Sequence, residues 1–345
     1  MKKFRRMLAV MMTVWMFLWM VAGCSDPGAS APGSGGSASP DGSGSGEDRL
    51  RVAFIFDTSI KDGGWSESGY KAMTELVEIY DLDYSWQEGV TTADAPDAIR
   101  NYANEGYDLI IDTQQYHCEV MAEIAPEYPD TTFACVNGYV SADNMIAITG
   151  DMWQHIYLAG VMSGLYTQSN KLGLITFSID SDSALTYYAA YEAGIKRVNP
   201  DAELIHVATG SFTDLAIGKE LATSLMDQGC DVIFCNSGDC NVTVMEECAN
   251  RGVYSIGAVI DHNDVSEDYV LGSAIQEPYD IVNLILNGYI DGSLKGSKEV
   301  TVMGIAEGVE EFRVNPALDV DQAVLDELET ATQEIISGEV TIELP

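Results

Sequence analysis

Residues Arg51-Val-Ala-Phe-Ile-Phe56, followed by Asp57-Thr-Ser-Ile-Lys-Asp-Gly-Gly-Trp-Ser-Glu67, decide the fold of this chain. The first six residues form a short apolar run rich in β-formers, and from Gly69 to Tyr80 apolar residues recur at helical spacing. The sequence therefore predicts a buried strand that ends in a glycine-rich turn, and the turn opens a helix. In open α/β sheets, ligands bind beyond the carboxyl ends of strands at turns of this kind.

The glycine-rich turn allows two interpretations. A carboxylate at Asp62, two glycines and the indole of Trp65 would form the rim of a ligand site. Alternatively, Asp62 caps the helix and Trp65 fills the core. The turn alone does not decide between them.

Apolar runs alternate with amphipathic segments along the rest of the chain. We expect strands at Arg51–Asp57, Asp108–Thr113, Thr132–Asn137, Met145–Thr149, Lys171–Ser178, Glu203–Ala208, Asp231–Asn236, Tyr254–Val259, Tyr269–Ala274 and Val300–Gly304. We expect helices near Trp65–Tyr80, Asp94–Asn104, Glu119–Tyr128, His155–Thr167, Ser183–Val198, Leu215–Gln228, Val242–Arg251, Pro278–Gly288 and Val320–Ser337.

This alternation predicts an α/β protein with parallel sheets covered on both faces. The roughly 300 residues of the patterned region exceed what one core usually holds, which indicates two Rossmann-like lobes with a hinged cleft between them. We expect residues 48–155 with about 277–312 to form the first lobe, and 156–276 with about 313–345 to form the second. The interlobe cleft would be the ligand site.

The N-terminus has the features of a secretion signal. Lys2, Lys3, Arg5 and Arg6 precede an apolar run that ends at Val21-Ala-Gly-Cys24. A cysteine after Val-Ala-Gly resembles the bacterial lipoprotein signal, so we expect 1–23 to be the signal peptide and Cys24 to carry the lipid. A membrane-spanning anchor is the alternative, but the run is shorter than the roughly 20 residues that one needs. Residues 24–47 are Gly-, Ser-, Ala- and Pro-rich, typical of a disordered tether.

Charge and cysteine content limit the possible partners. The chain has 17 basic and 54 acidic residues, a net charge of −37, and loss of the signal would make it more acidic still. Such a field repels nucleic acid and phosphorylated ligands and favours a neutral or cationic ligand. Besides Cys24 there are six cysteines (Cys118, Cys135, Cys230, Cys235, Cys240 and Cys248), mostly in apolar patterns, where buried thiols are expected. Their spacing matches no zinc pattern, and we expect no metal and no cofactor.

Polar and aromatic side chains follow the expected strands and would face the cleft. They are Asp57, Asp62, Trp65, Ser66, Gln114, Gln115, Tyr116, Asn137, Tyr139, Phe212, Asp214, Asn236, Asp239, Asp261 and Asp264. Aromatic plates with carboxylates that accept hydroxyl hydrogen bonds suit a flat, neutral, polyhydroxylated molecule. Each residue also has a plainer interpretation: Tyr116, Tyr139 and Phe212 as packing residues, Asp214 as a helix cap, and Asp261 with Asp264 as a solvated turn.

Several segments in register resemble one known family. They are Lys61-Asp-Gly-Gly-Trp-Ser-Glu-Ser-Gly69, Gly106-Tyr-Asp-Leu-Ile110, Ala125-Pro-Glu-Tyr-Pro-Asp-Thr-Thr-Phe133, Tyr157-Leu-Ala-Gly-Val-Met-Ser-Gly164, Gly210-Ser-Phe-Thr-Asp214, Gly229-Cys-Asp-Val-Ile233, Arg251-Gly-Val-Tyr-Ser-Ile-Gly257 and Ile335-Ile-Ser-Gly-Glu339. Together they are similar to the basic membrane protein family of ABC-transporter substrate-binding lipoproteins, the purine-nucleoside receptors. The resemblance covers the chain after the tether.

The resemblance implies a type I periplasmic-binding-protein fold that closes on a purine nucleoside or base. It implies that Trp65 stacks on the base, with Asp62 beside it, and that Asp261 holds the ribose. Asn137 stands where the family frequently has Asp, and Gln276 where it usually has Lys. The expected ligand-binding residues are Asp62, Trp65, Ser66, Tyr116, Asn137, Phe212, Asn236, Asp239, Asp261 and Gln276.

The resemblance also implies the protein's partners. We expect a monomer, lipid-anchored on the extracellular face of the cell membrane, that delivers its ligand to an ABC permease and its ATPase. A sensor of the same ligand that signals to a membrane receptor is the alternative. A nucleoside hydrolase using Asp62 and Asp261 is a remote one. The chain lacks Gly-x-Ser-x-Gly, His-Glu-x-x-His and Walker motifs, and its four histidines do not cluster in sequence, so we expect no enzyme.

Overall fold

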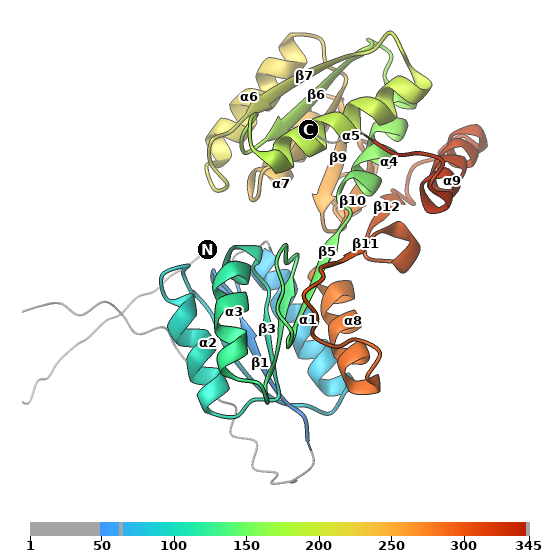
Figure 1. The fold of residues 1–345 in the computed structure, drawn as a ribbon. Helices are drawn as coiled ribbons and strands as arrows, with labels where there is room; N and C mark the ends of the chain where they lie inside the picture. Colours follow the sequence, from blue (N-terminus) through green and yellow to red (C-terminus); the bar gives the residue numbers. More distant parts are fainter. Residues whose placement is uncertain (1–48, 62–64, 343–345) are drawn as a thin grey trace, which may run out of the picture. The chain divides into compact units, whose positions relative to one another are not determined.

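A computed structural model describes residues 49–61 and 65–342, which belong to one compact unit of the chain. In these residues strands alternate with helices (Figure 1). The strands are β1 (Arg51–Ile55), β2 (Asp83–Gln87), β3 (Leu109–Asp112), β4 (Thr132–Val136), β5 (Met145–Gly150), β6 (Lys171–Thr176), β7 (Glu203–Ala208), β8 (Val232–Asn236), β9 (Tyr254–Val259), β10 (Val270–Ile275), β11 (Thr301–Met303) and β12 (Glu311–Val314). The helices are α1 (Trp65–Ile79), α2 (Ala95–Asn104), α3 (Cys118–Ile124), α4 (Trp153–Tyr166), α5 (Asp182–Val198), α6 (Leu215–Asp227), α7 (Cys240–Asn250), α8 (Pro278–Asp291) and α9 (Gln322–Ser337).

The strands form two sheets with the same serial order. One sheet runs β11-β5-β4-β3-β1-β2 and the other β12-β10-β9-β8-β6-β7. Neighbouring strands are parallel in both, except that β12 pairs antiparallel with β10. In each sheet the direction of strand addition reverses beside the first strand, at β1/β3 and at β6/β8. Ligands bind at such switch points, beyond the carboxyl ends of the strands.

Strand β1 shows why these sequences form doubly covered sheets. Val52 and Phe54 lie in one apolar cluster with α1 and α8 residues, whereas Ala53 and Ile55 lie in another with residues of α2 and α3. All four side chains are fully buried. Because both faces are covered, the strand is a continuous apolar run without alternation.

Helix ends follow the local sequence. Asp214 caps α6, its Oδ1 accepting from the backbone N–H groups of Ala216 (3.1 Å) and Ile217 (3.3 Å), as the plainer interpretation of that residue predicted. Pro278 opens α8. Gly338 ends α9 in the left-handed conformation that a helix C-terminus favours.

Helices α4 and α5 touch backbone to backbone. A Cβ on Gly160 would lie 2.3 Å from the carbonyl oxygen of Tyr191, and one on Gly194 would lie 2.0 Å from that of Tyr157. Both positions therefore need glycine for this helix crossing.

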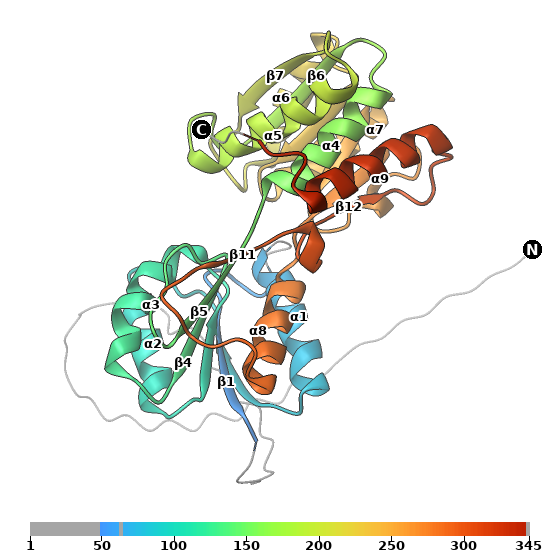
Figure 2. The same cartoon turned by 45° about the vertical axis from the view of Figure 1, so that its right-hand side comes forward.

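Three chain segments connect the two sheets: β5 to α4, β10 to α8, and β11 to β12 (Figure 2). After β10, helix α8 packs on α1, and β11 pairs with β5 of the first sheet. The chain then returns through β12 to the second sheet, where α9 packs on α4. The exact lobe boundaries given above stay a prediction.

The structure adds features that the sequence pattern did not predict. Strand β2 (Asp83–Gln87) and strand β12 (Glu311–Val314) were not expected, and β12 makes the second sheet mixed where only parallel pairing was predicted. The six described cysteines are free and buried, which confirms the interpretation as buried thiols. The signal peptide, Cys24 and the tether lie outside the described residues.

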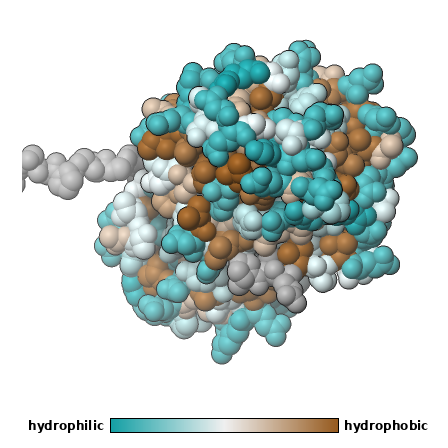
Figure 3. Space-filling model, turned by 90° about the horizontal axis from the view of Figure 1, so that it is seen from above, coloured by the Kyte–Doolittle hydropathy of each residue, from teal (hydrophilic) through white to brown (hydrophobic). Residues whose placement is uncertain are grey.

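The surface is mixed in polarity. Figure 3 shows hydrophilic residues over most of the face seen from above, with apolar residues in patches between them. Among the described helices, none is long and apolar enough to cross a membrane.

Candidate functional site

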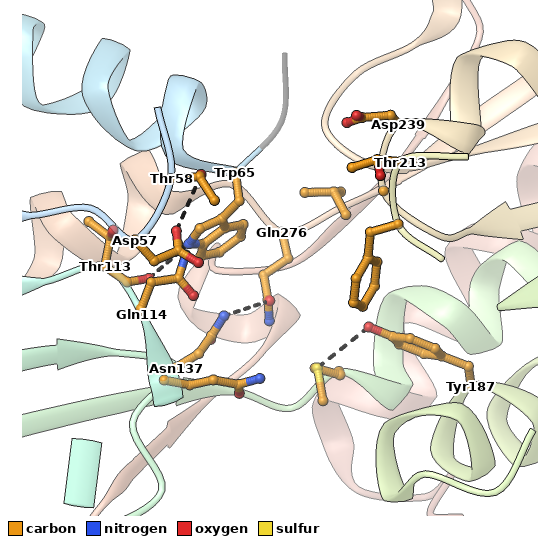
Figure 4. A pocket seen from close by; sticks show the side chains of 15 residues that line it. Asp57, Thr58, Trp65, Thr113, Gln114, Asn137, Tyr187, Thr213, Asp239 and Gln276 are labelled. Atoms are coloured by element: carbon orange, nitrogen blue, oxygen red, sulfur yellow. Dashed lines mark hydrogen bonds between the residues drawn. The ribbon is translucent and has the colours of Figure 1, made fainter. Parts of the chain in front are cut away.

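A cavity of about 390 Å³ lies at the carboxyl ends of strands from both sheets (Figure 4). Side chains that follow β1, β3 and β4 face it from the first sheet, and those that follow β7, β8, β9 and β10 from the second. Its lining residues are Asp57, Thr58, Trp65, Thr113, Gln114, Gln115, Asn137, Met152, Tyr187, Phe212, Thr213, Gly238, Asp239, Val259 and Gln276. This lining contains carboxylates, amides and aromatic rings, and the described part of the chain contributes no Lys, Arg or His to it.

Trp65 is the first residue of α1, and its ring is held in place. The indole Nε1–H donates to the backbone carbonyl oxygen of Thr113 across 2.8 Å (Figure 4). Thr113 follows β3 and is itself buried, its hydroxyl donating to the carbonyl oxygen of Ile55 (3.0 Å). The tryptophan is half-buried, so part of the ring stays available to the cavity.

Asp57 is held by three side chains. Its Oδ1 accepts from Ser66 Oγ (2.9 Å), from Gln114 Nε2 (2.8 Å) and, more weakly, from Thr58 Oγ1 (3.4 Å). Ser66 is fully buried and is not part of the cavity lining. In this structure Ser66 therefore orients Asp57, a second oxygen of which remains to accept hydrogen bonds.

Gln114 is supported from behind by a buried pair. The Asp112 carboxylate accepts from the backbone N–H of Gln114 (2.9 Å) and lies 2.9 Å from His117 Nδ1. Burial lowers the pKa of His117, but the adjacent Asp112 carboxylate outweighs it and leaves the pKa above its usual value. Burial raises the pKa of Asp112.

Asn137 and Gln276 join the two halves of the lining. Asn137 has a positive φ (55°), which asparagine tolerates better than most residues. Its Nδ2 donates to Gln276 Oε1 across 3.1 Å, and its Oδ1 accepts from the backbone N–H of Gly150 (3.4 Å).

Gln276 continues into a buried network. Its Nε2 donates to Glu310 Oε1 (3.0 Å), and Glu310 Oε2 lies 2.8 Å from His155 Nδ1. Glu310, His155 and Gln276 are all buried. A Cβ on Gly150 would lie 1.9 Å from Gln276 Nε2 and 2.6 Å from Glu310 Oε1, so the side chains pack directly on the backbone of the β5–α4 connection. The network thus touches all three connections between the sheets.

The second sheet contributes aromatic and backbone features. Phe212 is 49% exposed and stacks on Phe177, with ring centroids 4.1 Å apart and planes 8° apart. Tyr187 donates to Met152 Sδ across 3.8 Å (Figure 4), and burial raises its pKa to about 12, so it remains a neutral hydroxyl. Val259 has φ +74°, a strained conformation for a β-branched residue.

The expected site residues divide into three groups. Trp65, Asn137, Phe212, Asp239 and Gln276 line the cavity together. Four others lie in the described chain but not in the lining: Ser66 behind Asp57, Tyr116 on the surface at 58% exposure, Asn236 at the end of β8, and Asp261. Asp62 and Cys24 lie outside the described residues. Their roles stay predictions.

Asp261 belongs to a neighbouring cavity. Its Oδ2 accepts from Arg313 across 3.0 Å, and both residues line a separate hollow with Asn263 and Asn315. A ligand hydroxyl would have to compete with this cation for the carboxylate.

Sequence reasoning missed several lining residues. Met152 directly precedes α4, Tyr187 lies within α5, and Val259 is the last residue of an apolar strand, so none of them stands out as a loop residue. Asp57, Gln114 and Gln115 were recognised as loop residues after strands but were not selected. Their position after the first and third strands of a switch-point order was the available signal.

The potential metal ligands and the histidines of the described residues are dispersed. No group of three or more His, Cys, Asp or Glu side chains in the described residues could hold a metal ion. Three of the four histidines have separate partners: His117 pairs with Asp112, His155 with Glu310 and His206 with Thr176.

The family profile described as "ABC transporter substrate-binding protein PnrA-like" (Bmp) matches residues 49–344. Among curated relatives, the transcriptional activator protein Med of Bacillus subtilis is 26% identical over 250 residues, which are 71% of this chain and 77% of the relative. A purine-binding protein of Brucella abortus is 26% identical over 299 residues, 85% of this chain and 83% of that protein.

Solved structures show the same fold. A transcriptional activator of the comK gene from Bacillus halodurans superposes with a TM-score of 0.74 at 22% identity, covering 84% of this chain and 99% of that one. An ABC transporter solute-binding protein from Conexibacter woesei gives 0.71 at 20% identity, with 86% and 99% covered. The arabinose-binding component of a Shewanella ABC transporter, bound to arabinofuranose, gives 0.59 at 15% identity, with 84% and 98% covered.

These neighbours confirm the type I periplasmic-binding-protein fold, and the two sheets of this chain have the same serial strand order. The family match covers nearly all of the described chain. The protein belongs to the Bmp family of PnrA-like ABC-transporter substrate-binding proteins.

Proposed function

We propose that this substrate-binding protein captures a purine nucleoside, or the free base, and delivers it to an ABC permease and its ATPase. The observation that carries the proposal is the arrangement of the cavity lining. Trp65 from the first sheet and Phe212 from the second present aromatic rings to one cavity whose polar groups are carboxylates and amides. Stacking a base on an aromatic ring contributes about 1–3 kcal/mol.

The amides suit the edges of a purine. A side-chain amide has two N–H donors and two acceptor lone pairs. The amides of Gln114, Gln115, Asn137 and Gln276 can therefore hydrogen-bond a purine edge, which presents both kinds of group, in addition to the bonds described above. Asp57 and Asp239 supply carboxylates that accept from ribose hydroxyls. Asp261, the residue that the resemblance assigns to the ribose, lines a separate cavity and stays a candidate.

The charge of the lining favours the nucleoside over the nucleotide. Among the described residues, two carboxylates and no cationic side chain line the cavity, so a phosphate group would meet repulsion without a partner there. A volume of about 390 Å³ falls in the range of small-molecule sites. The purine-binding relative supports the base, whereas the arabinofuranose-bound neighbour makes a sugar the competing ligand.

Ligand identification tests the proposal directly. The protein, purified without added ligand, is denatured and the released small molecules are identified by mass spectrometry. Calorimetry of the protein stripped of ligand then compares inosine, guanosine, adenosine, adenine, adenosine monophosphate, arabinose and glucose.

We expect nucleosides to bind with micromolar or better affinity, the monophosphate at least 10-fold more weakly, and the sugars not at all. Each factor of 10 corresponds to about 1.4 kcal/mol. Tight binding of a free sugar without nucleoside binding would overturn the proposal. Recovery of hypoxanthine and ribose after incubation with inosine would instead point to a hydrolase.

We also propose a lipid anchor at Cys24 on the extracellular face of the cell membrane, as the lipobox suggests. The protein would function as a monomer. Mass spectrometry of the membrane-extracted protein tests the anchor: the N-terminal peptide should begin at Cys24 and carry acyl chains. A Cys24→Ser variant should lose both the cleavage before residue 24 and the acyl chains.

A further inference from the structure

A buried carboxylate lies directly behind the lining of the cavity. Glu310 belongs to the connection from β11 to β12, and only 2% of it is exposed. It is not among the described residues that line the cavity, but its Oε1 accepts from Nε2 of Gln276 across 3.0 Å, and Gln276 does line the cavity. Glu310 can therefore act on a ligand through the Gln276 amide.

The hydrogen bonds around Gln276 form a chain with a single direction. The backbone N–H of Gly150 donates to Oδ1 of Asn137 (3.4 Å), and Nδ2 of Asn137 donates to Oε1 of Gln276 (3.1 Å). Nε2 of Gln276 then donates to Glu310. A backbone N–H can only donate and a carboxylate can only accept, so both ends of the chain specify the same direction. Turning either amide over would place two donors, or two acceptors, against each other.

The carboxylate of Glu310 is itself held in place. Its Oε2 lies 2.8 Å from Nδ1 of His155, which is also buried. Oε1 and the Gln276 amide pack directly on the backbone of Gly150, where a Cβ would collide with both. Both oxygens of the carboxylate are thus engaged, and the carboxylate has a fixed position beside the amide.

Purines differ in polarity along the edge that a side-chain amide would contact. In adenine, position 6 carries an N–H donor and N1 accepts, whereas in hypoxanthine position 6 carries an oxygen acceptor and N1–H donates. An amide that turns over can match either edge. An amide held in one orientation matches one of these edges and opposes the other.

We propose that Glu310 is a positioning residue that makes the site selective between 6-amino and 6-oxo purines, because it holds the Gln276 amide in one orientation. This inference rests on the proposed function, since it concerns the same cavity and takes a purine as the ligand. After its bonds to Asn137 and Glu310, the Gln276 amide keeps one N–H and one oxygen lone pair. Which of the two meets position 6 of the base depends on Glu310.

Three substitutions separate positioning from packing. Glu310→Gln keeps an oxygen that accepts from Gln276, so the selectivity should persist. Glu310→Met keeps the length of the side chain but has no oxygen, so the amide loses the partner that opposes its rotation. Gln276→Leu removes the amide itself.

Tyr191 provides the matched control for a lost buried hydrogen bond. It is fully buried, and its hydroxyl donates to Ser163 Oγ across 2.8 Å between α5 and α4. Neither residue is among those described as lining the cavity. Tyr191→Phe therefore shows what general destabilisation does to ligand binding.

Calorimetry on the full chain, stripped of ligand, tests the proposal with adenosine, inosine and purine riboside. The measured quantity is the ratio of the Kd values for inosine and adenosine. Purine riboside carries only hydrogen at position 6, so a change in its affinity measures the loss that is common to all three ligands. For the unmodified protein we expect a ratio of at least about 10-fold in favour of one nucleoside, which corresponds to about 1.4 kcal/mol.

Glu310→Gln and Tyr191→Phe should keep this ratio, whereas Glu310→Met and Gln276→Leu should bring the two affinities to within about 3-fold of each other. If Glu310→Met weakens adenosine, inosine and purine riboside by the same factor, Glu310 has only a structural role and the proposal is overturned. If Glu310→Met does not fold, Gln276→Leu decides: loss of the ratio supports the proposal and an unchanged ratio overturns it.

Two results with the unmodified protein would also overturn the inference, and they differ in what they mean for the proposed function. Equal affinities for adenosine and inosine would remove the selectivity but leave a nucleoside receptor. No binding of any of the three nucleosides would remove the proposed function together with the inference.

Discussion

Asn137 donates from Nδ2 to Oε1 of Gln276 across 3.1 Å, joining the end of a strand in one sheet to the end of a strand in the other. This hydrogen bond engages the amide oxygen of Gln276, and the amide nitrogen Nε2 of Gln276 donates to Glu310 Oε1 across 3.0 Å. The orientation of that amide is therefore fixed by partners on both sides. Glu310 therefore helps to determine which atoms of the Gln276 amide face a ligand in the cavity.

Removing the carboxylate of Glu310 should destabilise the fold. Glu310→Ala leaves the buried side chains of Gln276 and His155 each without this acceptor, at a cost of about 1–3 kcal/mol per group. Glu310→Gln keeps the shape and one acceptor, so it should cost less. Urea unfolding followed by circular dichroism measures the change in free energy. Glu311→Gln, an exposed neighbour paired with Arg313, is the control and should stay near the unmodified protein. Equal stability of Glu310→Ala and Glu311→Gln would contradict the network.

Trp65 should contribute a stacking surface to ligand binding. Trp65→Ala should weaken nucleoside binding by 10-fold or more, about 1.4 kcal/mol, and Trp65→Phe should retain most of the affinity because a ring remains. Calorimetry measures both. Trp86→Phe is the matched control: Trp86 lies in β2, edge-on to Tyr70 with centroids 5.3 Å apart, and is not part of the lining. An affinity unchanged in Trp65→Ala would remove the indole from the site.

Two carboxylates compete for the role of ribose acceptor. Asp57 lines the cavity with its carboxylate oriented by Ser66 and Gln114, whereas Asp261 is paired with Arg313. We expect Asp57→Asn to weaken nucleoside binding about 10-fold, because hydrogen bonds to charged groups contribute about 1.5–3 kcal/mol. Asp261→Asn should have the smaller effect. Free base should be nearly insensitive to both. A larger loss of nucleoside affinity in Asp261→Asn than in Asp57→Asn would assign the ribose contact to Asp261.

The contact between α4 and α5 should not accept a methyl group. Gly194→Ala places a Cβ on the carbonyl oxygen of Tyr157 and should cost at least about 1–3 kcal/mol through overpacking. Alanine has the better helix propensity, so propensity alone predicts stabilisation of about 1 kcal/mol. Thermal unfolding distinguishes the two. Ala193→Gly makes the opposite change at the neighbouring position of the same helix and gives the size of the propensity effect. A Gly194→Ala variant that is more stable than the unmodified protein would show that α4 and α5 can move apart freely.

His206 should make the protein less stable in acid. Burial lowers its pKa below the usual value, so the unfolded chain binds a proton more readily than the folded one. Its contribution to stability is complete above the unfolded pKa of about 6.5 and is lost as pH falls toward the lower folded value. We expect His206→Gln to lose less stability than the unmodified protein between pH 7.5 and 5. Urea unfolding at both pH values tests this, and parallel losses in the two proteins would contradict it.

The sequence predicted the elements whose burial creates a pattern. Strand β9 begins and ends where the apolar run does, and β1 differs only at its end. Strand β2 was missed because its sequence, Asp83-Tyr-Ser-Trp-Gln87, is polar at an edge of the sheet and half exposed. Strand β12 is only four residues long and alternates charged with apolar residues, so it resembles a loop.

The site was predictable where position after a strand determines it. Trp65, Asn137, Phe212 and Asp239 follow strand ends, and the cavity includes them all. His155 and Glu310 could not be found in this way because their contact joins residues 155 positions apart. Nothing in the local sequence of either residue indicates a buried polar partner.

The side chains of Gln276 and Glu310 press on the backbone of Gly150, so one glycine links the packing of all three connections between the sheets. Those connections therefore cannot bend one at a time. Rotation at any one of the three connections shifts atoms that the other two also contact. The three connections should therefore move together as a single hinge.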